Sequence, residues 1–118
     1  MFKILVLDDN KDILEAISLV LKRKKFDVVT LQDASRLQNS LETFQPNLLM
    51  MDISMGMYDG RDLCRKIKLL SGNKDLPVVL FTAQTYTPES VEDAHANAFI
   101  EKPFHIKELY ELVDQFVQ

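Results

Sequence analysis

Five short apolar runs recur along the chain, and they constrain its fold more than any other feature. Each run is continuous rather than alternating, which is typical of strands in a parallel sheet that is covered on both faces. The runs occupy residues 4–7, 28–31, 48–51, 78–81 and 98–100. The sequence therefore predicts an α/β fold with five strands.

The segments between the runs carry apolar residues at helical spacing. Pro46 ends the second predicted helix, and Gly72 marks the end of the third. The fourth is expected to begin at Thr87, with Pro88 at its first helical position, and to be the weakest because little chain is available for it. The other apolar stripes are Ile13, Leu14, Ile17, Val20 and Leu21; Leu37, Leu41 and Phe44; Leu63, Ile67 and Leu70; and Ile106, Leu109 and Val113.

Strands that alternate with helices through short connections assemble by right-handed crossovers. The expected architecture is a doubly wound parallel sheet of five strands, flanked by five helices in three layers. A chain of 118 residues, 47% of them hydrophobic, suits one core. We expect a single domain over residues 1–118.

Composition excludes several classes of function. With 14 basic and 18 acidic side chains, the net charge is −4, which argues against direct binding to nucleic acid or to an anionic membrane. The three glycines form no phosphate-binding loop, and the single Cys64 with His95 and His105 gives no zinc spacing. No apolar run approaches the ~20 residues that span a bilayer. The expected location is the cytoplasm.

Charged and hydroxyl side chains follow four of the five predicted strands. Asp8 and Asp9 end the first, Asp52 the third, Thr82 the fourth and Lys102 the fifth. Ligands of such sheets bind at the carboxyl ends of the strands, so these five side chains are expected to face one crevice. Carboxylates about 4 Å apart repel by about 4 kcal/mol per pair at a dielectric near 20, and a hard divalent cation, Mg²⁺, would offset this.

A simpler interpretation of the Asp8-Asp9 pair is a helix N-cap with a solvated neighbour. Asp52 favours the cation site instead. It directly follows an apolar run and so lies at the edge of the core, where a charged side chain needs a partner.

These residues stand in short motifs whose order and spacing are highly specific. Together the motifs resemble the receiver domains of two-component response regulators, over all 118 residues. The matching segments are Leu7-Asp8-Asp9-Asn10; Met51-Asp52-Ile53-Ser54-Met55, with Asp59-Gly60 following; Phe81-Thr82-Ala83; and Phe99-Ile100-Glu101-Lys102-Pro103-Phe104. At the position of Gly56, these domains usually have a proline.

The resemblance implies a flavodoxin-like sheet with strand order 2-1-3-4-5 and a phosphoacceptor at Asp52. Lys102 would pair with the phosphoryl oxygens, through a cis Lys102-Pro103 linkage that aims it into the site. Thr82 would donate its hydroxyl to the phosphoryl group, and Phe99 would switch its rotamer with Thr82. Asp9 and Asp52 would bind Mg²⁺ by their side chains, Asp8 directly or through a water molecule, and Ser54 by its backbone carbonyl.

The implied partners are a sensor histidine kinase or phosphotransfer protein and a downstream output domain or protein. The implied state is a monomer or a weak, phosphorylation-dependent dimer. Such a chain is a phosphoacceptor switch that assists its own phosphorylation and dephosphorylation, rather than an enzyme.

Two other classes of function remain open from the residues. An aspartate-nucleophile phosphohydrolase would share the sheet, the acceptor and Mg²⁺, but needs a second acid where this chain has Ser54. A module that kept the fold without being phosphorylated is disfavoured by the complete set of Asp8, Asp9, Asp52, Thr82 and Lys102.

Overall fold

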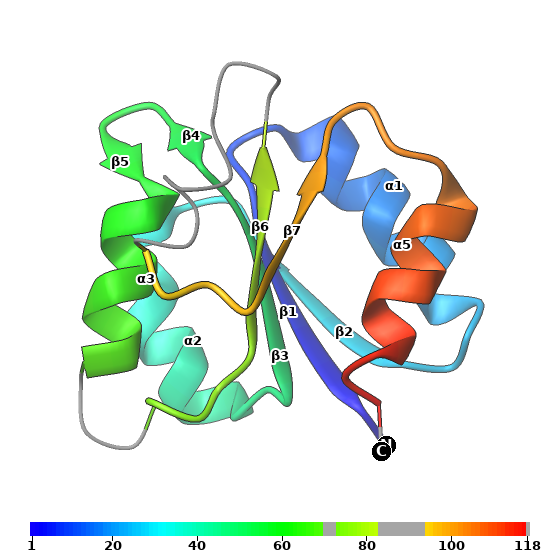
Figure 1. Cartoon of the computed structure of the whole chain (residues 1–118), viewed down its shortest axis with the longest axis horizontal. Helices are drawn as coiled ribbons and strands as arrows, with labels where there is room; N and C mark the ends of the chain where they lie inside the picture. Colours follow the sequence, from blue (N-terminus) through cyan, green and yellow to red (C-terminus); the bar gives the residue numbers. More distant parts are fainter. Residues whose placement is uncertain (70–72, 83–93, 118) are drawn as a thin grey trace.

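A computed structural model describes residues 1–69, 73–82 and 94–117 of the chain. Its main element is a parallel sheet of five strands in the order β2-β1-β3-β6-β7 (Figure 1). Counted along the chain this is the order 2-1-3-4-5, so the predicted topology is confirmed. The strands are β1 (Lys3–Leu7), β2 (Asp27–Leu31), β3 (Leu48–Asp52), β6 (Val78–Thr82) and β7 (Ala98–Glu101).

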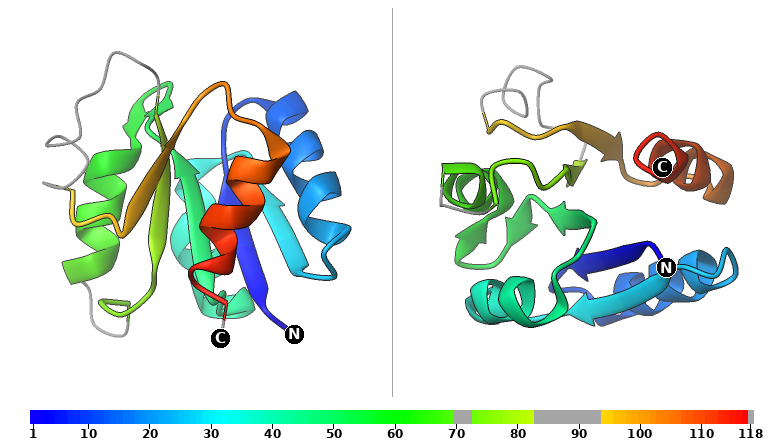
Figure 2. Two further views of the ribbon diagram at one scale, coloured as in Figure 1. Left: turned by 45° about the vertical axis from the view of Figure 1, so that its right-hand side comes forward. Right: turned by 90° about the horizontal axis from the view of Figure 1, so that it is seen from below.

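Helices cover both faces of the sheet (Figures 1 and 2). Helices α1 (Lys11–Lys22) and α5 (Ile106–Asp114) lie on one face, while α2 (Leu37–Phe44) and α3 (Gly60–Leu69) lie on the other. A 3-10 turn, η1 (Ala34–Arg36), precedes α2. The helix predicted from Thr87 lies outside the described residues, so the count of five helices stays a prediction. Within the described part of the chain, no helix has the length and apolar character to cross a membrane.

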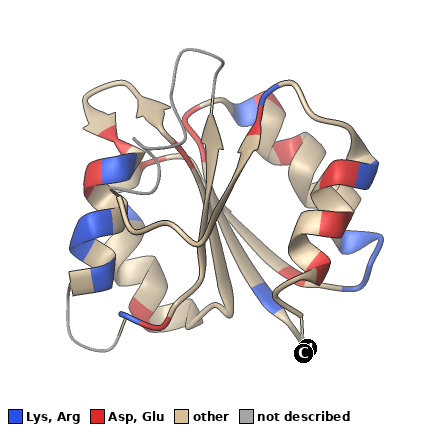
Figure 3. Cartoon of the chain, viewed as in Figure 1, with Lys and Arg blue, Asp and Glu red and all other residues tan. Residues whose placement is uncertain are grey.

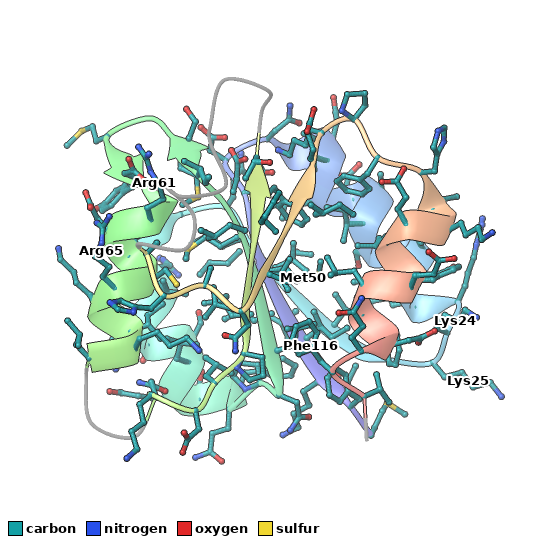
Figure 4. The ribbon with its side chains drawn as sticks, in the orientation of Figure 1. Lys24, Lys25, Met50, Arg61, Arg65 and Phe116 are labelled. Atoms are coloured by element: carbon teal, nitrogen blue, oxygen red, sulfur yellow. The ribbon has the colours of Figure 1, made fainter. Side chains whose placement is uncertain are left out.

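Each face of the sheet has its own hydrophobic core, because side chains along a strand alternate between the two faces. In β3, Leu48 and Met50 pack with residues of α1 and α5, whereas Leu49 and Met51 pack with residues of α2 and α3. Figure 4 shows Met50 within the molecule. Burial on both faces is why the inner strands β1, β3 and β6 read as continuous apolar runs.

The register of the sheet brings its polar strand ends to one edge. Leu7 pairs with Met51 between β1 and β3, so the residues that follow them, Asp8 and Asp52, are neighbours. Asp52 in turn pairs with Phe81 of β6. The residues at the carboxyl ends of β1, β3 and β6 therefore lie side by side.

A small antiparallel hairpin follows β3, and the sequence patterns did not predict it. It consists of β4 (Ser54–Met55) and β5 (Tyr58–Asp59). Its turn begins at Gly56, which has a φ of +62°. Two-residue hairpin turns require this left-handed conformation at their first central position, and glycine adopts it without a Cβ clash.

Candidate functional site

Three carboxylates cluster beyond the ends of β1 and β3. Asp8, Asp9 and Asp52 each place an oxygen within 4.8 Å of the others. Asp8 is only 1% exposed, Asp52 is half-buried and Asp9 is exposed. Asp8 follows Ile4 and Val6 on the α1–α5 face of the sheet, and Asp52 follows Leu48 and Met50 on that same face. Figure 3 shows the acidic segments meeting at this edge of the sheet.

Lys102 bridges two of these carboxylates. Its Nζ lies 2.9 Å from Asp8 Oδ2 and 3.2 Å from Asp52 Oδ1. Its backbone N–H donates to the Thr82 carbonyl at 2.7 Å, which carries the β6–β7 pairing one residue beyond the strand. The Lys102-Pro103 peptide is cis, as the resemblance implied. An ammonium from the last strand thus reaches carboxylates from the first and third.

The second carboxylate oxygen of Asp8 also accepts a hydrogen bond. Asp8 Oδ1 accepts the backbone N–H of Asn10 at 2.9 Å. Asn10 is the N-cap of α1, because its own side-chain oxygen accepts the backbone N–H groups of Asp12 and Ile13. The N-cap interpretation of the Asp8-Asp9 pair is therefore wrong, since Asn10 fills that role and leaves the two carboxylates for the site.

Burial and charge act together on the ionisation of this site. Burial raises the pKa of Asp52, Lys102 lowers it, and the carboxylates of Asp8 and Asp9 raise it further, with a net increase. Burial lowers the pKa of Lys102, but its hydrogen bond to Asp8 and the charges of Asp52 and Asp8 more than offset this, so the pKa is raised. The ammonium stays charged, while a second cation would favour ionisation of Asp52.

The donor set of the cluster fits a hard divalent cation. It consists of carboxylate oxygens, which Mg²⁺ prefers, and it contains no imidazole or thiolate that would select a softer metal. Three carboxylates face the single ammonium of Lys102, so negative charge remains to be compensated. Ser54 opens β4 two residues after Asp52 and is exposed, and the expected role of its backbone carbonyl as a ligand stays a prediction.

Thr82 and Phe99 lie on the other face of the sheet. Val78 and Leu80 of β6 pack with residues of α2 and α3, and Thr82 follows them by alternation. Phe99 pairs with Leu80 and is 41% exposed, so its ring points outward here. The two residues thus share one face, as a coupled pair requires. The expected approach of the Thr82 hydroxyl to the crevice stays a prediction.

Gln32 is a neighbour of the site that the sequence analysis missed. Its side-chain amide donates to the backbone carbonyl of Asp9 at 3.1 Å. Gln32 directly follows β2, so it occupies a strand end like the predicted residues. Its position directly after the second apolar run is the sequence signal that could have identified it.

Comparisons with known proteins agree with this geometry. The sequence profile of the response regulator receiver domain matches residues 4–114. The DNA-binding response regulator MtrA of Mycolicibacterium smegmatis is 32% identical over 109 residues, which are 91% of this chain and 46% of that protein. The heme response regulator HssR of Staphylococcus saprophyticus is 32% identical over 108 residues, 89% of this chain and 46% of that protein. This chain spans about half the length of both relatives.

Solved structures show the same fold. A response regulator signal receiver domain from Bermanella marisrubri superposes with a TM-score of 0.88 at 26% identity, covering 98% of each chain. The chemotaxis response regulator CheY4 of Vibrio cholerae superposes with a TM-score of 0.88 at 20% identity, covering 99% of each chain. The second likeness concerns the fold alone.

Proposed function

This chain belongs to the response regulator receiver domain family, and we propose that Asp52 is the phosphoacceptor of a Mg²⁺-dependent signalling switch. One observation carries the proposal. The half-buried Asp52 lies in a carboxylate cluster at the sheet edge, with the Lys102 ammonium 3.2 Å from its oxygen. A nucleophilic carboxylate beside an ammonium group is suited to receive a phosphoryl group.

The proposed reaction begins with attack of an Asp52 carboxylate oxygen on the phosphorus of a phosphohistidine. The new O–P bond forms as the P–N bond breaks, and the imidazole nitrogen keeps the electron pair and takes a proton from solvent. Lys102 holds a position from which its ammonium can leave the carboxylates and pair with the arriving phosphoryl oxygens. The product is an acyl phosphate on Asp52.

The carboxylates of Asp8, Asp9 and Asp52, with the backbone carbonyl of Ser54, are the proposed Mg²⁺ ligands. When bound, the cation neutralises the negative charge that spreads over the phosphoryl oxygens during transfer. The Asp8 carboxylate is oriented by the Asn10 N–H and the Lys102 ammonium, and the Gln32 amide binds the backbone carbonyl of Asp9. The oxygens of Asp8 are thus held in place before a ligand arrives.

The proposed donor is a sensor histidine kinase or phosphotransfer protein. An apolar groove of about 600 Å³ between α1 and α5 supports this, because Lys102, whose ammonium lies 3.2 Å from the acceptor carboxylate, is one of its lining residues. A helix that carries a phosphohistidine could lay an apolar stripe in the groove and direct the histidine to Asp52. The groove is lined by Ile13, Ala16, Ile17, Val20, Lys102, Pro103, Phe104, Ile106 and Leu109.

The proposed output is a separate domain or protein whose state depends on Thr82 and Phe99. Relatives of about twice this length are DNA-binding regulators. Thr82 is 4% exposed, whereas Phe99 is 41% exposed on the same face of the sheet. A phosphoryl group that draws the Thr82 hydroxyl towards Asp52 would free space for the Phe99 ring.

Intact-mass measurement after treatment with acetyl phosphate tests the proposal. With Mg²⁺ we expect the mass of one phosphoryl group to be added, and in excess chelator none. Acetate measured in the same samples separates a switch from a phosphohydrolase: a switch releases about one equivalent quickly and then slows to the rate at which the acyl phosphate hydrolyses. Labelling that is equal in chelator would contradict the metal requirement.

Mg²⁺ alone is expected to stabilise the fold. The carboxylate cluster exists only in the folded chain, so a cation that binds it shifts the unfolding equilibrium by about 2.7 kcal/mol at a hundredfold excess over its dissociation constant. Thermal melts with and without Mg²⁺ measure this shift. Asp9→Asn should show a smaller one, and Glu15→Gln, an exposed change on α1, serves as the matched control. Superimposed melts of the wild type would show that the site does not bind Mg²⁺.

A further inference from the structure

Two glycines in the segment after Asp52 are required for opposite reasons. Gly56 has a φ of +62°, but a Cβ added there would meet nothing within 4 Å. Gly60 opens α3 with a φ outside the left-handed range, yet a Cβ there would overlap the backbone carbonyl oxygen of Asp52. Gly56 is thus needed for the left-handed backbone conformation of the hairpin, and Gly60 is needed because the backbone of α3 approaches the Asp52 carbonyl closely.

The close approach involves the peptide that joins Asp52 to Ile53. A Cβ on Gly60 would lie 3.0 Å from the Asp52 carbonyl carbon and 3.0 Å from Ile53 Cα, besides the overlap with the oxygen. The Gly60 N–H donates to the Ile53 carbonyl at 2.7 Å. The first residue of α3 therefore rests directly on the backbone of the acceptor.

The other side of this peptide is held by the sheet. The Ile53 N–H donates to the Phe81 carbonyl at 3.2 Å, and Asp52 pairs with Phe81 in the register of β3 and β6. The Asp52-Ile53 peptide is thus fixed between β6 and the start of α3. Any added atom at position 60 must move either this peptide or the helix.

The helix is anchored against moving away. Cys64 and Ile67 of α3 are buried in the core beneath it. At its start, Asp59 accepts the Arg61 backbone N–H at 2.8 Å and binds the Arg61 guanidinium at 2.6 Å. Figure 4 shows Arg61 on the first turn of α3. Because the buried side chains of α3 hold the helix in place, we expect the Asp52-Ile53 peptide to be the part that shifts.

We propose that Gly60 is a positioning residue for the phosphoacceptor. By lacking a Cβ, it lets α3 support the Asp52-Ile53 peptide and so sets the direction of the Asp52 carboxylate towards Lys102 and the metal ligands. This inference rests on the proposed function, because it concerns the same acceptor. Gly60 touches no reacting atom and acts through the backbone of Asp52.

Gly60→Ala and Gly56→Ala form a matched pair for the test. Both variants should melt below the wild type, the first from overlap and the second from its left-handed φ. At a temperature where both are folded, we expect Gly60→Ala to be phosphorylated by acetyl phosphate about 100-fold more slowly at saturating Mg²⁺, since a displacement of about 1 Å can cost this much. Gly56→Ala should stay within about threefold of the wild type.

A spectroscopic readout separates positioning from general loss of stability. The ¹³C carbonyl resonance of Asp52 should shift in Gly60→Ala and stay in place in Gly56→Ala. Equal rates for the two variants, or an unmoved Asp52 resonance, would overturn the inference. Failure of the wild type to be labelled would instead overturn the proposed function.

A second variant covers the case in which Gly60→Ala does not fold. Asp59→Ala loosens the start of α3 by removing the acceptor of the Arg61 bonds, and it adds no atom near Asp52. We expect it to be phosphorylated at least about threefold more slowly than the wild type, with a smaller shift of the same Asp52 resonance. An unchanged rate and resonance in Asp59→Ala would contradict the proposal.

Discussion

Asp52→Asn is expected to take up no phosphoryl group from acetyl phosphate in the presence of Mg²⁺. The amide is a poor nucleophile, and the other two carboxylates of the cluster are engaged as proposed metal ligands. Intact mass is the measurement, with Asp62→Asn as the matched control because Asp62 is an exposed aspartate on α3. Full labelling of Asp52→Asn would show that another residue is the acceptor.

The same variant should be more stable than the wild type when Mg²⁺ is removed. Burial raises the pKa of Asp52, so the folded chain holds that proton more tightly than the unfolded chain. The free energy of unfolding therefore falls as pH rises from the ordinary aspartate pKa to the raised value, and the deficit persists at neutral pH. Removing the charge should therefore raise the free energy of unfolding, as measured by urea unfolding at neutral pH with chelator. A variant less stable than the wild type would contradict this.

Lys102→Met is expected to change phosphoryl transfer and metal binding in opposite directions. Transfer from acetyl phosphate should slow by about 10²- to 10³-fold, because a charged donor to the developing oxyanion is lost. Mg²⁺ should bind about tenfold more tightly, since the ammonium that lies 2.9 Å from Asp8 and 3.2 Å from Asp52 no longer repels it. Calorimetric titration with Mg²⁺ and the rate of mass increase measure the two effects.

Lys107→Met is the matched control for this prediction. Lys107 is an exposed lysine on α5 that pairs with Glu111 at 3.8 Å. Its removal changes the net charge equally but leaves the cluster untouched, so both quantities should stay near the wild-type values. If Lys102→Met binds Mg²⁺ more weakly than Lys107→Met, Lys102 does not compete with the cation.

The strands of the sheet were predictable from the sequence because burial on both faces removes polar residues from a strand, whereas their order was implied by the resemblance to receiver domains. Each of the five runs became a strand of the sheet. The edge that carries the site was also predictable, since the charged residues that end the apolar runs mark the carboxyl ends of the strands, where ligands of such sheets bind. Asp52 after Met51 is the clearest case.

The details that depend on pairs of distant residues were not predictable. The β4–β5 hairpin is only two residues long on each side, which is too short for any alternation to show. The closeness of Gly60 to the Asp52 carbonyl follows from packing in space, which spacing along the chain does not record. The face of the sheet on which Thr82 lies was also not predictable, because β6 is buried on both faces and its sequence does not distinguish them.

The carboxylate site depends on the number of residues in β1 and β3 and on the register between these strands. Asp8 and Asp52 meet because each is the next residue on the α1–α5 face after a pair of buried positions. One residue inserted into β3 would keep the composition of the strand but rotate Asp52 to the α2–α3 face, among apolar side chains. This domain therefore tolerates different kinds of mutation unequally. The strands accept the exchange of one apolar residue for another. Insertion or deletion of a single residue within β1 or β3 separates the carboxylates of Asp8 and Asp52.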